Sequence, residues 1–469
     1  MLMLWMLLAC GEKDSSSALI EQVDLSDTIT VEDIGADVEF STAKQCGECH
    51  PTHYAQWQQS MHAYAAHSPV FDAMAQKAYR DTSGAVGTFC TGCHSPIGTI
   101  QGEDGSTQAH QRSDISKDSV SCEVCHSAVT HDNPVGNLSL RLTTTGEKYG
   151  PFDDIALDGH DSLQNPFLSS PTLCGSCHDV FNFPGLRIEE AFSEYAMSPA
   201  AEMDVTCQDC HMSPIPGRKS ERTKGPIAVV EGEVYPDREL SSHRFIGPDY
   251  SLIDNFPYPN DLDESATAQI ELKEQIHVLL QNSIQLSDLR RTQSNGEDVI
   301  ELDIESLVTG HNVPTGFTSE RQLWVSIEVR NQNGQLLYQS GDLDANGDLR
   351  DDHSWAVQGH QADKDTQLVN FQSKNRIRHG EVTLPDISET VFPFEADYIE
   401  KFSLRPLEVR TVQYTLPNSV STDLGNAPAN ISVKLQYRNL PPYLLRALNL
   451  QDLVPRLEIF TIDTLERSL

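Results

Sequence analysis

The sequence predicts an α+β protein of two folded domains. A loop-rich, mainly helical domain is expected over about residues 41–260, and a β-sandwich of immunoglobulin-like type over 261–469. Three observations lead to this prediction. The chain has 469 residues, which exceeds one ordinary domain. All of its cysteines lie before His211. From about Asp261 onward, apolar and polar residues alternate with a period of two, as in half-buried strands.

The C-terminal elements follow from this alternation. The β-branched and aromatic residues of four runs are typical of strands, and turns such as Asn333-Gly334 separate them. These runs cover residues 299–307, 322–330, 409–416 and 431–437. A helix at 266–281 is expected to bridge the two domains, and a second helix is expected at 442–448. Several period-two strands of this kind favour a sandwich of two sheets.

The first ten residues are apolar and end in Leu7-Leu8-Ala9-Cys10, which matches a bacterial lipobox. We expect export and lipid attachment at Cys10, although a chance cysteine in an apolar N-terminus is the alternative. Residues 11–40 are rich in serine and acidic residues, as expected of an acidic tether. No later run approaches the roughly 20 apolar residues of a membrane span, so the lipid would be the only anchor. The expected location is the bacterial cell envelope, in the periplasm, at the outer membrane or on the cell surface.

The chain carries 33 Lys and Arg against 69 Asp and Glu, a net charge of −36. Such a charge disfavours binding to nucleic acid or to anionic lipid. It favours solubility and electrostatic steering toward a basic partner.

Apart from Cys10, the ten other cysteines fall without remainder into five Cys-x-x-Cys-His motifs. Two thiols three residues apart can form thioethers with the two vinyl groups of one haem, and the following histidine can bind its iron. The motifs are motif 1, Cys46-Gly-Glu-Cys49-His50; motif 2, Cys90-Thr-Gly-Cys93-His94; motif 3, Cys122-Glu-Val-Cys125-His126; motif 4, Cys174-Gly-Ser-Cys177-His178; and motif 5, Cys207-Gln-Asp-Cys210-His211.

Zinc sites and disulfides are the competing interpretations of these cysteines. Tetrahedral zinc would combine the pairs into sets of four, and five pairs do not divide in that way. Disulfides require no histidine after every second cysteine. The motifs therefore predict five covalently bound haem c groups, with His50, His94, His126, His178 and His211 as the proximal iron ligands.

The sixth position of each iron separates an electron carrier from a catalyst. Twelve of the seventeen histidines remain after the motifs are counted, so five bis-histidine haems of low potential could form. The candidate distal ligands are His62, His131, His160, His243 and His311.

The run CGECHPTHYAQWQQSMHAYA, at residues 46–65, begins a helix at Pro51 that we expect to continue to residue 66. It resembles the multihaem cytochromes related to the tetrahaem cytochrome c of nitrification and to hydroxylamine oxidoreductase. The resemblance continues through VSCEVCH at 120–126 and CQDCHMSP at 207–214. In that family a Trp-x-x-Ser-x-His segment supplies a distal ligand, which implies this role for His62. The segment Thr309-Gly-His311-Asn-Val-Pro-Thr-Gly316 resembles a Gly-His-x-x-Pro-Thr-Gly segment found after the haem region of many multihaem cytochromes. This resemblance implies that His311 reaches a haem, and a loop capped by the histidine is the alternative.

The run from Asp342 to Asp348 has the oxygen spacing of a calcium loop, but His353 stands where an EF-hand requires glutamate. Calcium is therefore a candidate ligand, and an acidic turn is the preferred interpretation.

The leading functional hypothesis is a relay of electrons between redox partners, such as other cytochromes or a quinol-linked donor. The alternative is a multihaem reductase or oxidase of small nitrogen or sulfur compounds with one open haem. Pentahaem nitrite reductases typically carry lysine in place of one motif histidine, and all five motifs here end in histidine. In a third hypothesis, the β-domain is a binding module that the haem domain connects to a porin complex or a mineral acceptor.

Overall fold

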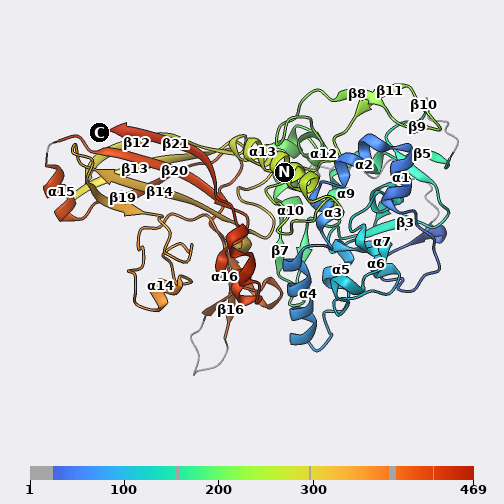
Figure 1. Cartoon of the computed structure of the whole chain (residues 1–469), viewed down its shortest axis with the longest axis horizontal. Coiled ribbons are helices and arrows are strands. Elements are labelled where there is room, and N and C mark those ends of the chain that lie inside the picture. Colours follow the sequence, from blue (N-terminus) through green and yellow to red (C-terminus); the bar gives the residue numbers. More distant parts are fainter. Residues whose placement is uncertain (1–24, 155–158, 295–296, 380–386, 426) are drawn as a thin grey trace, which may run out of the picture.

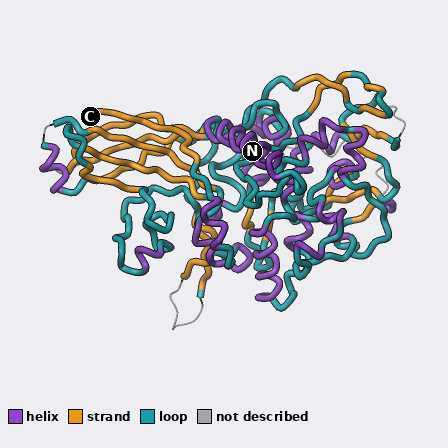
Figure 2. Tube along the Cα trace, viewed as in Figure 1, coloured by secondary structure: helices purple, strands orange, loops and turns teal. Residues whose placement is uncertain are grey.

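The computed structural model describes residues 25–154, 159–294, 297–379, 387–425 and 427–469. Short helices and small sheets occupy the N-terminal half, on the right of Figure 1, and long strands extend to the left from the C-terminal half. Figure 2 shows how much of the N-terminal half is loop. Cys10 lies outside the described residues.

The N-terminal helices are short, and four of the motif cysteine pairs lie wholly within one helix. Helix α1 begins after Thr42, whose side chain accepts a hydrogen bond from the backbone N–H of Gln45. At the start of α12, the backbone N–H of Thr206 donates to the Asp209 carboxylate at 3.1 Å. The helices are α1 (Ala43–Cys49), α2 (Pro51–Trp57), α3 (Met61–Tyr64), α4 (Pro69–Asp81), α5 (Phe89–His94), α6 (Pro96–Ile100), α7 (Asp114–Lys117), α8 (Cys122–His126), α9 (Pro171–Gly175), α10 (Ala191–Ala196), α11 (Pro199–Glu202) and α12 (Cys207–His211).

The helix expected from Pro51 to residue 66 is divided in two. Helix α2 ends at Trp57, and Ser60 adopts an extended conformation in which its hydroxyl accepts a hydrogen bond from the backbone N–H of Ala63. A serine that caps a new helix competes with continuation of the preceding one. The break turns α3, and with it His62, away from the axis of α2.

Small sheets supplement these helices, which the expectation of a mainly helical domain did not include. The strands are β1 (Thr28–Ile29), β2 (Ala128–His131), β3 (Leu140–Thr143), β4 (Lys148–Gly150), β5 (Ser162–Gln164), β6 (Val180–Phe181), β7 (Arg187–Glu189), β8 (Thr223–Pro226), β9 (Val229–Val230), β10 (Glu233–Val234) and β11 (Asp237–Leu240). Strand β1 pairs with β3, and Ile29, Val31 and Phe40 pack against a hydrophobic cluster around Ile97 and Ile100. From Leu25 onward, the predicted tether is therefore part of the fold, because it has apolar side chains to bury.

The C-terminal half begins with the long helix α13 (Leu262–Gln281) and ends with the long strand β21 (Phe460–Ser468). Between them lie β12 (Ile284–Ser294), β13 (Glu297–Ser306), β14 (Gln322–Arg330), β15 (Leu336–Ser340), α14 (Trp355–Gln358), β16 (Lys374–Arg378), β17 (Ile387–Thr390), β18 (Tyr398–Glu400), β19 (Val409–Thr415), α15 (Asn418–Leu424), β20 (Asn430–Arg438) and α16 (Pro442–Ala447). The sheets have the strand orders β12-β13-β19, β15-β14-β20-β21 and β17-β16-β18, all antiparallel.

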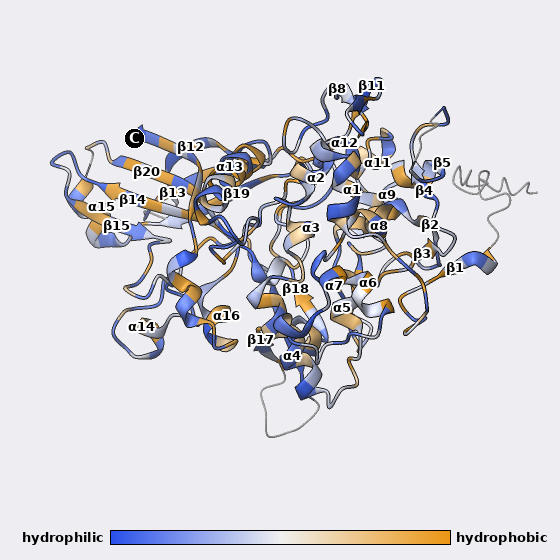
Figure 3. Ribbon diagram, turned by 45° about the vertical axis from the view of Figure 1, so that its right-hand side comes forward, coloured by the Kyte–Doolittle hydropathy of each residue, from blue (hydrophilic) through white to orange (hydrophobic). Residues whose placement is uncertain are grey.

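One hydrophobic core joins the two larger sheets. Ile300 and Ile304 of β13 are fully buried, as are Val325 of β14 and Val433 of β20. Figure 3 shows hydrophobic and hydrophilic residues alternating along these strands. The structure thus contains mixed helix and open sheets, and the immunoglobulin-like assignment stays a prediction.

The two halves share this core. Tyr250, from the segment before α13, is buried with it, and its hydroxyl oxygen accepts a hydrogen bond at 2.7 Å from the backbone N–H of Glu458 in the C-terminal segment. Arg321 binds Asp249 with an Nη2–Oδ2 distance of 2.6 Å. In the described part of the chain, no helix is long and apolar enough to cross a membrane.

Candidate haem site

A single cavity of about 2250 Å³ runs through the N-terminal half and reaches the C-terminal half. Pockets for one small molecule measure roughly 300–1,000 Å³, so this cavity has room for several cofactors. All ten motif cysteines and all five motif histidines line it, together with apolar side chains such as Trp57 and Phe245. The non-motif histidines in its lining are His53, His62, His160, His243 and His311.

The thiols of different motifs lie against one another. A hydrogen bond between the Cys46 and Cys122 thiols lowers the pKa of Cys46 and raises that of Cys122. The same kind of bond joins Cys93 to Cys177, and another joins Cys174 to Cys207. These contacts connect motif 1 to motif 3, motif 2 to motif 4, and motif 4 to motif 5.

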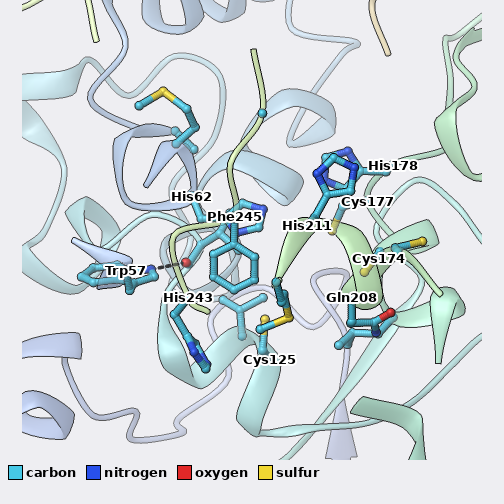
Figure 4. Close-up of a pocket in the computed structure, with 18 of the residues that line it drawn as sticks. Trp57, His62, Cys125, Cys174, Cys177, His178, Gln208, His211, His243 and Phe245 are labelled. Atoms are coloured by element: carbon cyan, nitrogen blue, oxygen red, sulfur yellow. Dashed lines mark hydrogen bonds between the residues drawn. The ribbon is translucent and has the colours of Figure 1, made fainter. Parts of the chain in front are cut away.

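Motif 3 also approaches motif 4. The charge of the Cys125 thiolate would act on both Cys174 and Cys177, which shows that the three sulfur atoms lie in one region. Figure 4 shows these cysteines together with His178 and His211 in the wall of the cavity. Motif 4 is therefore the meeting point of motifs 2, 3 and 5.

Backbone carbonyls fix four of the motif imidazoles. The Nδ1 atom of His50 lies 2.7 Å from the Ile227 oxygen, and that of His126 lies 2.7 Å from the Tyr149 oxygen. A ring that donates from Nδ1 presents Nε2 as its free, metal-binding nitrogen. The corresponding distances are 3.3 Å for His94 to the Ala65 oxygen and 3.0 Å for His211 to the Ile246 oxygen.

His178 is the exception among the motif histidines. Its Nδ1 atom lies 3.8 Å from Oε1 of Glu189, a carboxylate whose side chain is 4 % exposed. Burial alone would lower the pKa of His178, but the carboxylate outweighs it and raises that pKa.

Four motif imidazoles each face a non-motif imidazole. The ring centroids are 6.3 Å apart for His50 and His160, for His62 and His178, and for His126 and His243, and 6.1 Å apart for His211 and His311. Two imidazole nitrogens that share one metal at about 2.0 Å each place their ring centroids about 6.2 Å apart. The spacing of these pairs thus fits an iron between the two rings, and the thiols beside them fit the thioether bonds of haem c.

Three of the rings that face the motif histidines, those of His62, His243 and His311, are in their neutral form at neutral pH. Burial lowers the pKa of His62 and of His243 to about 3, and that of His311 to about 4. Neighbouring histidines lower these pKa values further. A neutral imidazole is the form that binds a metal.

Motif 2 differs from the others because no imidazole faces His94 in the described residues. Its ring is instead stacked on Phe71 of α4, with the centroids 4.1 Å apart and the planes within 7°. Burial lowers the pKa of His94 to about 4.

The structure does not bring His131 into the cavity. It lies in β2, its ring contacts Phe167, and its Nδ1 atom lies 2.9 Å from the Asp132 oxygen. His53 also lines the cavity. Its ring lies 6.1 Å from that of His50, three residues earlier on the chain and nearly perpendicular to it, and it meets the ring of His243 edge-on at 4.8 Å, which leaves no room for a metal between His53 and His243. His160 is exposed at the edge of the cavity, and Figure 4 shows His62 beside Phe245.

A loop of the C-terminal half carries His311 into the cavity. The Glu194 carboxylate of α10 accepts a hydrogen bond from the Asn312 N–H at 3.1 Å and one from the Thr315 hydroxyl at 2.6 Å, and it also binds the Asn312 side chain. The Ala200 N–H donates to the Thr309 oxygen at 3.1 Å. These bonds hold the loop from both ends. No sequence pattern singled out Glu189 or Glu194, since isolated glutamates are common in an acidic chain.

The acidic turn at 342–348 uses its carboxylates internally. Asp344 accepts hydrogen bonds from the backbone N–H groups of Asn346 and Asp348 and from the Ser354 hydroxyl, and Asp348 forms an ion pair with Arg446. Across the ranges that the structure describes, no group of three His, Cys, Asp or Glu residues could hold a metal ion. The geometry is that of a capped turn and offers no calcium cage.

Two comparisons with known proteins found similarities to this chain. Residues 45–127 match the family described as cytochrome c554 and c-prime. This match spans motifs 1 to 3. The fold is similar to that of a penta-haem cytochrome c552 from Thermochromatium tepidum, with a TM-score of 0.58 and 19% identity, covering 92% of this chain and 99% of the other. No curated protein matches the chain. Together the two similarities support a multihaem c-type cytochrome.

Proposed function

We propose that the protein is a pentahaem c-type cytochrome that relays electrons between redox partners. The observation that carries this proposal is the set of four facing imidazole pairs, which lie in one cavity beside the motif thiols. Haem c, when bound, supplies a one-electron couple at each iron. In this proposal His160, His62, His243 and His311 are the distal ligands of motifs 1, 4, 3 and 5. A filled sixth position suits electron transfer, because it leaves no site for a substrate.

The thiol contacts define the proposed route. Motif 1 contacts motif 3, motif 3 approaches motif 4, and motif 4 contacts motif 5. Motif 2 joins the route at motif 4 through Cys93 and Cys177. Motif 4 is thus the branch point of a chain whose ends are motifs 1, 2 and 5. The exposure of His160 marks motif 1 as one place where a partner can exchange electrons.

The test is the electron paramagnetic resonance spectrum of the oxidised holoprotein with a haem count. We expect five haems, of which four are low-spin with two histidine ligands. Replacement His311→Ala should convert one further haem to high-spin. A holoprotein with fewer than five haems, or an H311A spectrum identical to that of the wild type, contradicts the proposal.

A second candidate function rests on motif 2. Since His94 faces no imidazole among the residues that the structure describes, one haem could keep an open sixth position and reduce or oxidise a small nitrogen or sulfur compound. A stoichiometric high-spin signal that shifts on addition of nitrite or hydroxylamine favours this function. A spectrum that neither compound changes favours the relay alone.

The C-terminal half serves, in this proposal, to shield the haem cavity and to supply His311. The sequence near Cys10 supports export and lipid anchoring in the cell envelope, with other cytochromes or a quinol-linked donor as partners. Globomycin-sensitive processing and labelling with a radioactive fatty acid test the anchor, and a Cys10→Ser variant is the matched control.

A further inference from the structure

Glu189 occupies a position with no equivalent at the other motifs. Four motif histidines meet a neutral backbone oxygen at Nδ1, whereas His178 meets a carboxylate at 3.8 Å. The difference originates in the hairpin that follows motif 4. Strand β6 begins two residues after His178, and its residue Val180 pairs with Glu189 of β7. This pairing brings Glu189 next to the imidazole of His178.

The carboxylate is buried at an energetic disadvantage. Its side chain is 4 % exposed, and its Oε2 atom has no hydrogen-bond partner. Within the described residues its ion-pair partner is His178, while Arg187 is bound to Asp179 and Arg321 to Asp249. The charge of Arg321 also acts on the Glu189 carboxylate from a longer distance. Burying a charge away from water destabilises a fold unless its partners compensate it fully. If the side chain at position 189 served only to pack the interior, a glutamine or an apolar residue would be more favourable than a charged carboxylate.

A carboxylate next to the Nδ1–H of a ligating imidazole changes the metal. It draws the N–H proton toward itself, makes the ring a stronger electron donor, and adds negative charge close to the iron. Both effects stabilise ferric iron more than ferrous iron, so the reduction potential falls. A backbone carbonyl has the same direction of effect but carries no net charge.

We propose that Glu189 is a positioning and tuning residue that makes the haem of motif 4 the lowest in potential of the bis-histidine haems. This inference rests on the proposed electron relay, since it assigns a role within that chain. Because motif 4 contacts motifs 2, 3 and 5, electrons would pass through the branch point without residing there. They would accumulate instead on the outer haems, from which a partner can remove them.

The test is a potentiometric titration of the holoprotein followed by electron paramagnetic resonance, with dithionite as reductant. Glu189→Gln keeps the shape of the side chain and removes its charge. We expect the midpoint of one low-spin haem to rise by about 59 mV or more, which is a tenfold or greater change in its ratio of reduced to oxidised iron. Glu189→Asp, which keeps the charge at a longer distance, should cause a smaller rise.

Glu103→Gln is the matched control. Glu103 is a half-buried carboxylate bound to the Ser113 N–H and the Ser116 hydroxyl, and no motif imidazole lies among its hydrogen-bond partners. Its replacement should leave the midpoints of all low-spin haems in place. Unchanged midpoints in E189Q, or equal shifts in E189Q and E189D, overturn the proposal.

The wild-type titration provides a measurement that does not depend on the folding of a variant. One bis-histidine haem should titrate at least about 59 mV below the others. Four equal midpoints would overturn the role of Glu189 while leaving the relay intact. Loss of the bis-histidine signals themselves would instead contradict the proposed function.

Discussion

Glu194 holds the loop of His311 in place. In the proposed relay His311 is a distal iron ligand, so replacement of Glu194 by alanine should release it. The carboxylate accepts three hydrogen bonds, from the backbone and side chain of Asn312 and from the Thr315 hydroxyl. A hydrogen bond to a charged group contributes roughly 1.5–3 kcal/mol. The three bonds are not additive, so we take about 3 kcal/mol as the loss in Glu194→Ala. A loss of about 3 kcal/mol lowers the ratio of docked to undocked loop by roughly 100-fold.

The assay is the spin state of the oxidised holoprotein. In Glu194→Ala, one low-spin haem should be replaced by a high-spin haem, as in His311→Ala, and the haem count should stay the same. Glu190→Ala is the control, because Glu190 lies on the same segment and its ion pair with Lys401 is at the surface. An exposed pair of this kind contributes about 0–1 kcal/mol. A low-spin signal of full intensity in E194A would refute the reasoning about the loop.

Three further predictions concern the other histidines and the junction of the two halves. His160→Ala should convert one haem to high-spin while His131→Ala should not, because only His160 faces a motif imidazole; electron paramagnetic resonance of the two variants compares them directly. Burial holds the pKa of His62 at about 3, below the ordinary value of 6.5 for an unfolded chain, so the unfolded state binds more protons between these values. The stability contributed by neutral His62 is therefore complete above pH 6.5 and is lost as the pH falls toward 3, and thermal unfolding at pH 7.5, 6, 5 and 4 should show a falling midpoint. Arg321→Met breaks a part-buried ion pair with Asp249 and should lower the free energy of unfolding by about 2 kcal/mol, measured by denaturant titration. Arg330→Met is the control, because its ion pair with Glu328 is exposed.

The C-terminal strands could be predicted closely because each buries alternate residues. The run at 322–330 coincides with β14, and the run at 409–416 ends one residue beyond β19. Alternation of apolar and polar residues with a period of two indicates that one face of a strand is buried, and this holds for any neighbouring strand. The order of strands within each sheet does not follow from this pattern, since pairing depends on which apolar faces meet in the folded chain.

The haem domain was predictable at its attachment points and less so between them. Each motif predicts haem attachment from its sequence alone, because the spacing of two thiols and an imidazole fits one haem. The break at Ser60 was missed, because its hydroxyl caps a new helix in the middle of the run that was expected to form one helix. His131 was chosen for its place after motif 3, yet β2 directs its ring away from the cavity and toward Phe167. The number of residues between a histidine and a motif does not tell in which direction the histidine side chain points in the folded protein.

The pair formed by His211 and His311 has a consequence for the order of maturation. His211 and its two cysteines belong to the half of the chain that is synthesised first, whereas His311 arrives on a loop that must dock on α10. In the proposed relay, haem attachment at motif 5 would therefore precede completion of its ligand set. The spin state of that one iron in the proposed relay would then report whether the second half has folded onto the first, and a chain cleaved between the two halves would show a high-spin iron at motif 5.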